Sequence, residues 1–321
     1  MNLSQLNNVA VLGLGTMGHG IAQVFAMAGY QVRCYDMHPG IREGALQRIR
    51  GNLDELVAAD VVRQDSVDET LSRITVVDDE SMAVEAAQFV TEAVAEELPV
   101  KQEMLVRLES YVSEDTILAS NSSSFTITQS AVHMVRPERA IVTHWFNPPH
   151  IIPVVEVVPG ESTSQGTTEV TMQLLRKCRK QAVHLKKEIP GFLVNRVQIA
   201  MYREIWDLLD QGVASADEID AAIRGSMGMR LAAIGPLKVH DFAGIDIALQ
   251  TYEALIKHMR SNQEIPPLVR QLTDEGHYGA KTGRGFYEYT PESLKADFNV
   301  RDQRYLQLIK LLYDGSQDES A

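Results

Sequence analysis

Hydrophobic residues follow two different patterns in the two parts of the chain. From residue 8 to about 186, short β-rich runs alternate with helical patterns such as 98–112 and 166–178. The runs are VAVLG, QVRCYD, RITVV, FVTEAV, TILAS, AIVTHW, VVEVV and AVHLK. Strands that alternate with helices in this way are typical of a parallel, doubly wound sheet.

After Ile189-Pro190-Gly191 the strand signal ends, and long amphipathic stretches take its place. These stretches are 192–211, 216–225, 236–260, 265–275 and 303–313. Because Pro190 suits the start of a helix, we place the domain boundary near Lys187. The predicted architecture is an α/β doubly wound domain over 1–187, followed by an all-α domain over 188–321.

Length, composition and charge narrow the possible functions. A chain of 321 residues is long enough for two hydrophobic cores, and no run approaches the roughly 20 apolar residues that span a bilayer. The net charge of −13 disfavours nucleic acid as a partner. No export signal is visible, and Cys34 and Cys178 lie in segments predicted to be buried, so we expect reduced thiols and a cytoplasmic protein.

A glycine-rich turn follows the first strand and opens a helix. The run is Gly13-Leu14-Gly15-Thr16-Met17-Gly18, and the next strand ends in Asp36. Glycines at these spacings allow a tight turn, let backbone amides approach a pyrophosphate, and let the helix pack on the strand. A carboxylate at the second strand accepts hydrogen bonds from ribose hydroxyls and repels a 2′-phosphate. The pattern therefore predicts a Rossmann domain that binds NAD rather than NADP.

Alternatives to NAD stay open at this point. Arg33 and His38 lie close to Asp36 in the sequence and could offset its repulsion of a 2′-phosphate. A glycine turn of this kind also occurs with FAD or with no ligand at all. We expect no metal ion in the site.

Polar residues follow or interrupt three later strands, near the sheet edge where such folds bind ligands. Asn121-Ser122-Ser123-Ser124 follows TILAS, His144 lies near the end of AIVTHW, and Glu156 lies within PVVEVV. Oxidation of an alcohol requires a base for the hydroxyl proton while hydride leaves for a nicotinamide, and His144 suits that role. A glutamate in an apolar strand is costly unless paired, so Glu156 is its expected partner. The alternatives are that His144 is a core histidine whose hydrogen bonds are satisfied within the protein, that Glu156 faces the surface, and that the serine run only forms a turn.

Seven motifs occur in order along the chain. They are GLGTMGHGIA, EAVAEELPVK, SNSSSF, HWFNPPHIIPVVEVV, PGFLVNR, GPLKVHDFAGID and GHYGAKTGRGFYEY. Together they resemble the L-3-hydroxyacyl-CoA dehydrogenase family over nearly the whole length. The resemblance implies an NAD-dependent dehydrogenase, which forms a homodimer through its helical domain.

The same resemblance implies a role for each site residue. Ser123 and Asn195 would hydrogen-bond the reacting substrate oxygen, His144 would be the general base, and Glu156 would orient it. Glu96 and Lys101 would lie close to the nicotinamide end of the cofactor. Asn121 completes the predicted cofactor-binding set, together with the glycine turn and Asp36. Asn195 is inferred from the resemblance alone.

The substrate is the open question, because members of this family act on acyl-CoA thioesters or on small free acids. CoA-using members commonly end the helix after the second strand with paired lysines, whereas this chain has Leu53–Asp60 there. No lysine occurs between Met37 and Lys101, although Arg42, Arg48 and Arg50 remain. An acidic, lysine-free segment is a poor clamp for CoA phosphates.

Two further segments, Asn147-Pro148-Pro149-His150 and Gly228-Met229-Arg230-Leu231, resemble the branch that acts on small free acids. That branch includes L-gulonate 3-dehydrogenase, the λ-crystallin relative, and a pyridine-carboxylate dehydrogenase. An arginine fork suits a carboxylate, so we hypothesise that Arg230 anchors the substrate, with His150 as a second candidate. The alternatives for Arg230 are a solvated helix-terminal residue or a salt bridge in a dimer.

We therefore expect an NAD-linked dehydrogenase of a small hydroxy acid, and a 3-hydroxyacyl-CoA dehydrogenase is the alternative. A crystallin-like protein that binds NADH without turnover is disfavoured, because all four catalytic positions are intact. Dehydrogenases similar to the 6-phosphogluconate enzyme require a lysine that GFLVNRVQIAMYRE lacks.

Overall fold

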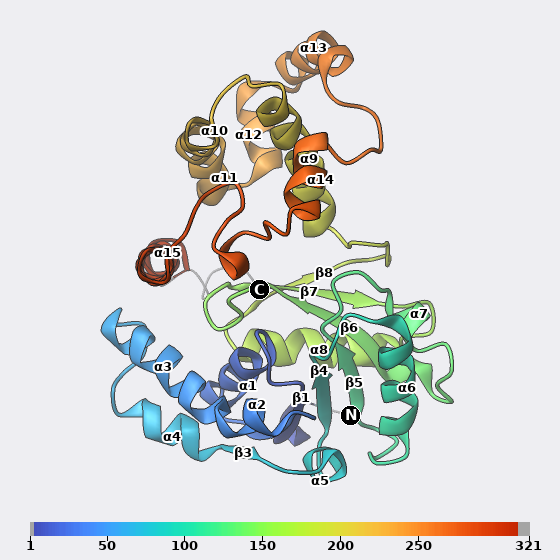
Figure 1. Cartoon of the computed structure of the whole chain (residues 1–321). Helices are drawn as coiled ribbons and strands as arrows, with labels where there is room; N and C mark the ends of the chain where they lie inside the picture. The colour runs from blue at the N-terminus through green and yellow to red at the C-terminus, as the bar shows by residue number, and fades with distance from the viewer. Residues whose placement is uncertain (1–2, 314–321) are drawn as a thin grey trace. The chain divides into compact units, whose positions relative to one another are not determined.

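The computed structural model describes residues 3–313, which form two compact units (Figure 1). The first unit extends to Asn195 and also includes Tyr305–Ile309. The second contains Arg196–Arg304 and, among the described residues, 310–313. The chain thus leaves the first unit a few residues beyond the predicted boundary near Lys187, and part of its last helix returns to that unit.

An eight-stranded sheet forms the centre of the first unit, in the order β3-β2-β1-β4-β5-β6-β7-β8. The strands are β1 (Asn8–Leu12), β2 (Gln31–Tyr35), β3 (Ile74–Val76), β4 (Phe89–Glu92), β5 (Ile117–Ser120), β6 (Ala140–Trp145), β7 (Val154–Pro159) and β8 (Gln181–His184). Each hydrophobic run that predicted a strand forms one. The order reverses between β1 and β4, which is where doubly wound sheets bind ligands.

One strand pairing departs from the predicted parallel sheet. β7 runs antiparallel to β6, and His144 lies directly opposite Glu156 in this pair. Residues 146–153 join the two strands, and this connection is shorter than the crossover of a dozen or more residues that a parallel pair needs. The carboxyl end of β6 and the amino end of β7 therefore lie at the same sheet edge.

Helices cover both faces of the sheet, as Figure 1 shows. On one face lie α1 (Gly18–Met27), α3 (Ala45–Ala58), α4 (Ser66–Ser72) and α8 (Gln165–Lys177). On the other lie α5 (Glu80–Val84), α6 (Leu98–Glu109) and α7 (Ile127–Ser130). In β1, Val9 and Val11 join the first core and Ala10 and Leu12 the second, because successive side chains point to opposite faces. A sheet covered on both sides explains why its strands are apolar throughout.

The last helix, α15 (Pro291–Tyr313), contributes to the core of the first unit. Leu306 is only 3% exposed in that core, and Tyr305 and Ile309 pack against it. The amphipathic pattern of 303–313 predicts a helix, but it does not reveal which core the helix joins.

The second unit is helical, as the amphipathic stretches predict. Its helices are α9 (Val194–Asp210), α10 (Ala216–Ile223), α11 (Met229–Ile234), α12 (Pro236–Ala243), α13 (Ile245–Leu255) and α14 (Pro267–Asp274), with a π-helical turn at Arg224–Gly228. Gly244, with a φ of 99°, divides the predicted 236–260 helix into two. The α/β fold followed by an all-α domain is confirmed.

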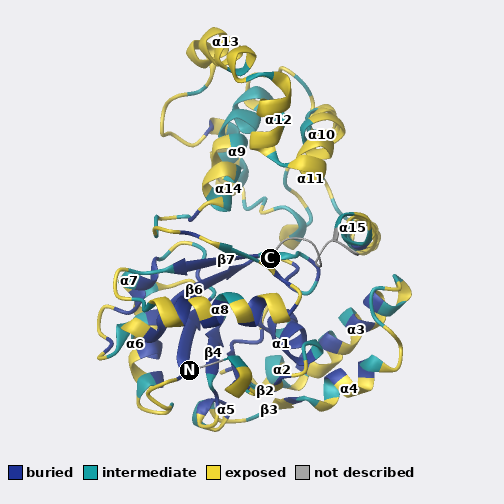
Figure 2. Ribbon diagram, turned by 180° about the vertical axis from the view of Figure 1, so that it is seen from behind, coloured by how far each residue is buried: buried dark blue, intermediate teal, exposed yellow. Residues whose placement is uncertain are grey.

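Apolar side chains remain exposed on this second unit. Among the described residues, α9 to α14 contain no buried position, and Figure 2 shows these helices in the colours of intermediate and exposed residues. The exposed fraction is 81% for Leu237 and 76% for Phe242. Within residues 3–313, no helix is both long and apolar enough to cross a bilayer.

Candidate active site

The glycine turn after β1 has the geometry of a dinucleotide cradle. Gly13 has a φ of 84°, and a Cβ on Gly18 would lie 1.7 Å from the carbonyl oxygen of Gly13. A Cβ on Gly15 would meet no atom within 4 Å, so the chain leaves space beside it. No side chain caps the amino end of α1 in the described structure, which leaves backbone N–H groups suited to a pyrophosphate. These features fit NAD.

Asp36 follows β2 next to this turn and is 8% exposed. Its Oδ2 accepts a hydrogen bond from the backbone N–H of Leu14 at 2.7 Å, and its Oδ1 accepts one from His38 N–H at 2.9 Å. Asp36 thus braces the turn as well as occupying the position predicted for ribose recognition. Arg33 pairs with Glu85 at 2.9 Å, so its charge is already compensated.

His144 and Glu156 form a buried hydrogen bond between adjacent strands. His144 Nδ1 lies 2.7 Å from Glu156 Oε2, and the two residues are 4% and 0% exposed. Since a carboxylate only accepts hydrogen bonds, the ring proton is on Nδ1. Nε2 is then the nitrogen that can accept a proton from a substrate. The structure therefore brings together the pair that sequence reasoning proposed.

A turn before α9 holds the other oxygen of Glu156. Glu156 Oε1 accepts hydrogen bonds from the backbone N–H groups of Leu193, at 3.1 Å, and Val194, at 2.9 Å. The turn contains Gly191 and Phe192, whose φ angles are 75° and 49°. A left-handed backbone is uncommon for an aromatic residue and persists only where its surroundings stabilise it. The buried Phe192 ring lies 5.5 Å from the His144 ring, and sequence reasoning missed this support.

Asn195 is hydrogen-bonded to the serine turn. Its Nδ2 donates to the carbonyl oxygen of Ser123 at 3.3 Å. Asn121 Oδ1 accepts from the backbone N–H of Trp145 at 3.0 Å and so ties the ends of β5 and β6 together. Hydrogen bonds from residues 193–195, where α9 begins, thus link the His144–Glu156 pair with Ser123.

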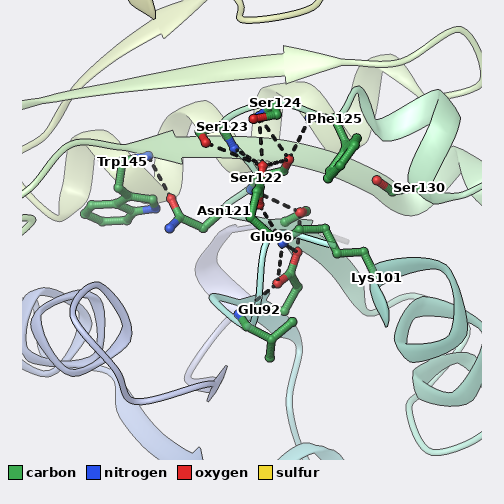
Figure 3. A network of polar contacts seen from close by, with 12 residues as sticks. Glu92, Glu96, Lys101, Asn121, Ser122, Ser123, Ser124, Phe125, Ser130 and Trp145 are labelled. Carbon is green, nitrogen blue, oxygen red and sulfur yellow. Dashed lines mark hydrogen bonds and ion pairs between the residues drawn. The ribbon is translucent and has the colours of Figure 1, made fainter. Parts of the chain in front are cut away.

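Glu96 and Lys101 belong to a polar network around the serine turn (Figure 3). Glu96 Oε1 accepts from Ser122 Oγ at 2.7 Å and from the backbone N–H groups of Ser123 and Ser124, both at 2.8 Å. Burial acts to raise the pKa of Glu96, but these bonds and the Lys101 charge lower it below its ordinary value. Glu96 is therefore an ionised brace for the turn.

Lys101 also pairs with a residue that sequence reasoning missed. Its Nζ lies 2.9 Å from Glu92 Oε1, and both residues are 1% exposed. The available signals were a glutamate at the end of the apolar strand FVTE and a lysine in the helix that follows.

The two candidate anchors of the substrate carboxylate, Arg230 and His150, belong to different units. Arg230 is exposed on α11 of the second unit, where its Nε donates to Ser226 O at 3.4 Å. His150, in the first unit, has its Nδ1 3.4 Å from Asn52 Nδ2. Among the described residues, no group of three or more His, Cys, Asp or Glu side chains could hold a metal ion.

Comparison with known proteins identifies the family. The family model for the 3-hydroxyacyl-CoA dehydrogenase NAD-binding domain matches residues 8–189, and that for the C-terminal domain matches residues 191–289. The chain belongs to the 3-hydroxyacyl-CoA dehydrogenase family. It is an NAD-dependent oxidoreductase that acts on a hydroxyl group.

Two curated relatives of this dehydrogenase act on different substrates. A 5-formyl-3-hydroxy-2-methylpyridine 4-carboxylate 5-dehydrogenase from Mesorhizobium japonicum is 34% identical over 315 residues, which is 97% of this chain and 100% of the relative. A probable 3-hydroxybutyryl-CoA dehydrogenase from Bacillus subtilis is 37% identical over 286 residues, 89% and 98% of the two chains.

A solved structure of a protein with the same activity as the first of these relatives is also similar to this chain. It is a 5-formyl-3-hydroxy-2-methylpyridine 4-carboxylic acid 5-dehydrogenase, described as an NAD+-dependent dismutase. The two structures superpose with a TM-score of 0.90 at 34% identity, and the match covers 97% of this dehydrogenase and 99% of the other chain.

Proposed function

We propose that this dehydrogenase oxidises the secondary hydroxyl group of a small free hydroxy acid, with His144 as the general base. The observation that carries the proposal is the buried hydrogen bond of 2.7 Å between His144 Nδ1 and Glu156 Oε2. It fixes the imidazole so that Nε2 is the proton acceptor, which is the arrangement that alcohol oxidation requires.

Each catalytic side chain has a distinct part in this reaction. His144 Nε2 takes the hydroxyl proton, and Glu156 stabilises the imidazolium that results. Ser123 and Asn195 hydrogen-bond the substrate oxygen as its bond to carbon changes from single to double. Bound NAD supplies the acceptor for the hydride that leaves the same carbon. In the reverse direction His144 returns its proton to the oxygen.

The segment between Met37 and Lys101, which would meet the CoA phosphates, has few cationic groups free to bind them. Its arginines already have partners within the protein: Arg42 pairs with Asp78 at 3.3 Å, and Arg50 pairs with Asp68 at 2.9 Å. Arg48 donates to two backbone carbonyls, each at 3.0 Å. Together with the absence of lysine from this part of the sequence, these contacts favour a free acid over a thioester.

The Mesorhizobium japonicum relative supports the same choice, because its name describes a carboxylate substrate without CoA. We propose Arg230 as the anchor for the substrate carboxylate, since its guanidinium is exposed and can form a bidentate pair. The second candidate is a 3-hydroxyacyl-CoA substrate, which the Bacillus subtilis relative favours at 37% identity.

Initial rates of NADH formation test this proposal. The panel contains L-3-hydroxybutyryl-CoA, L-3-hydroxybutyrate, L-gulonate and L-carnitine, assayed with the wild type, His144→Gln and the control His133→Gln. His133 is an exposed histidine outside the proposed site. We expect a free acid to be preferred and His144→Gln to lower kcat by about 10²- to 10⁴-fold, with NADH affinity retained.

Three results would contradict parts of the proposal separately. Preference for the thioester would contradict a free-acid substrate and support a 3-hydroxyacyl-CoA substrate. Full turnover by His144→Gln would remove His144 as the base. An unchanged KM for the acid in Arg230→Ala would remove the anchor.

We also propose that the enzyme is a homodimer, because the apolar side chains of its second unit need a covering surface. A cytoplasmic location remains a prediction that depends on the two free, buried cysteines.

A further inference from the structure

Glu92, at the end of β4, is a buried carboxylate that receives four hydrogen bonds or ion-pair contacts. Its Oε1 accepts from Ser120 Oγ and lies 2.9 Å from Lys101 Nζ. Its Oε2 accepts from the backbone N–H of Val94 at 3.1 Å and lies 3.1 Å from the same Nζ. A carboxylate that is 1% exposed is costly unless it is paired in this way.

Lys101 connects this carboxylate to a second one. Its ammonium group is also 1% exposed, and it lies 3.2 Å from Glu96 Oε2. An ammonium has three N–H donors, and here they face two carboxylates. Glu92 therefore compensates the charge of Lys101 and fixes the direction from which Lys101 reaches Glu96.

Glu96 in turn fixes the backbone of the serine turn. One of its oxygens, Oε1, accepts from the N–H groups of Ser123 and Ser124 and from the hydroxyl of Ser122. Figure 3 shows the three charged side chains and the serine turn in one continuous network. A displacement of the Glu96 carboxylate would therefore move the Ser123 backbone.

We propose that Glu92 is a positioning residue, which acts through Lys101 and Glu96 to hold the turn at Ser122–Ser124 in place. Its role in turnover rests on the proposed function of Ser123, whereas its effect on the turn does not. The chain of contacts runs from the end of β4, through α6, to the end of β5, and it couples three elements at the sheet edge that carries His144.

Hydrogen–deuterium exchange of the free enzyme tests the effect on the turn. Glu92→Gln preserves the shape of the side chain and removes its charge. The matched control is Glu97→Gln, which removes one carboxylate from the exposed residue next to Glu96. We expect Glu92→Gln to raise exchange in a peptide that spans 121–126 by about 10-fold, with little change in peptides from α3 and α8. Wild-type exchange in that peptide would overturn the proposal.

A double variant separates positioning from folding. Glu92→Gln leaves the buried Lys101 ammonium with less compensation, so the single variant can lose stability for that reason alone. In Glu92→Gln/Lys101→Met no buried ammonium remains, and we expect thermal stability to recover while exchange at 121–126 stays fast. Recovery of slow exchange in the double variant would show that the network does not hold the turn.

Kinetics on the best substrate then relate the turn to catalysis. We expect Glu92→Gln to lower kcat by about 10-fold or more while the NADH dissociation constant stays within about twofold. Faster exchange in the serine turn with unchanged kcat would support the positioning role of Glu92 and contradict the proposed role of Ser123. Unchanged exchange in the turn with reduced kcat would contradict the positioning role of Glu92.

Discussion

At the scale of single residues, Lys180 shows how burial and charge compete. Its side chain is buried, and its Nζ donates to the carbonyl oxygens of Pro149, at 2.7 Å, and Ile152, at 2.8 Å. It therefore ties the start of β8 to the segment that follows the His144 strand. Burial lowers the pKa of Lys180 to about 7.

This shift predicts a pH-dependent stability. Between pH 7 and about 10.4, Lys180 is mostly neutral in the folded protein and protonated in the unfolded chain. The unfolded state then binds one more proton, so stability rises with pH by up to about 1.4 kcal/mol per pH unit from this group. Urea unfolding at pH 7.5 and 9.5 should show a gain about 2 to 3 kcal/mol larger for wild type than for Lys180→Met. Lys177→Met, at an exposed lysine, is the control, and equal gains in wild type and Lys180→Met would contradict the shift.

At the scale of elements, Gly15 and Gly18 have different roles in the turn between β1 and α1. Gly18 allows the helix to approach the turn, since a Cβ there would lie 1.7 Å from Gly13 O. A Cβ on Gly15 would have no protein atom within 4 Å, so the packing of the protein itself does not require a glycine there. We propose that its absent side chain leaves room for the cofactor.

Alanine substitutions separate these two requirements. We expect Gly18→Ala to lower the melting temperature by several degrees and to weaken NADH binding. Gly15→Ala should leave the melting temperature within about 2 °C and still raise the NADH dissociation constant about 10-fold or more. Thermal unfolding and fluorescence titration measure the two effects. Similar melting temperatures for both variants would contradict the packing role of Gly18.

At the scale of the whole molecule, the exposed apolar side chains of the second unit favour self-association. The most exposed examples are Leu237, Phe242 and Met229. We expect light scattering to give a mass about twice 35.7 kDa for the purified enzyme. Leu237→Asp/Phe242→Asp should shift this mass toward the monomer, while Val135→Asp, at an exposed valine of the first unit, should not. A monomeric wild type at micromolar concentration would contradict the proposed dimer.

Much of the fold follows from local pattern, because strands, helices and turns reflect the residues within them. All eight strands, the glycine turn and the helical second part could be predicted in this way. The direction of β7 could not be predicted from its apolar residues, because hydrophobic alternation is the same in both directions. The short connection at 146–153 was the available signal, since it excludes a parallel crossover.

The candidate site divides in the same way. His144 and Glu156 could be paired from the sequence, because a histidine and a buried acid on consecutive strands explain each other. The support of Glu156 by the turn at Phe192 could not be inferred, because that contact depends on the distance between segments remote in the chain, which no local pattern encodes. The pairing of Lys101 with Glu92 does have a signal in the sequence, since a glutamate ends the apolar strand FVTE and a lysine follows in the next helix.

The amino-acid sequence by itself determined the element types, the glycine turn and the candidate pair of His144 and Glu156, because these depend on residue identity and short spacing. Only the tertiary structure decided that Leu306 joins the first core and that the turn at Phe192 supports Glu156. Burial removes water from a polar group such as the Glu156 carboxylate, so that group needs a hydrogen-bond or ion-pair partner within the protein. The packing of the elements decides which residue is that partner.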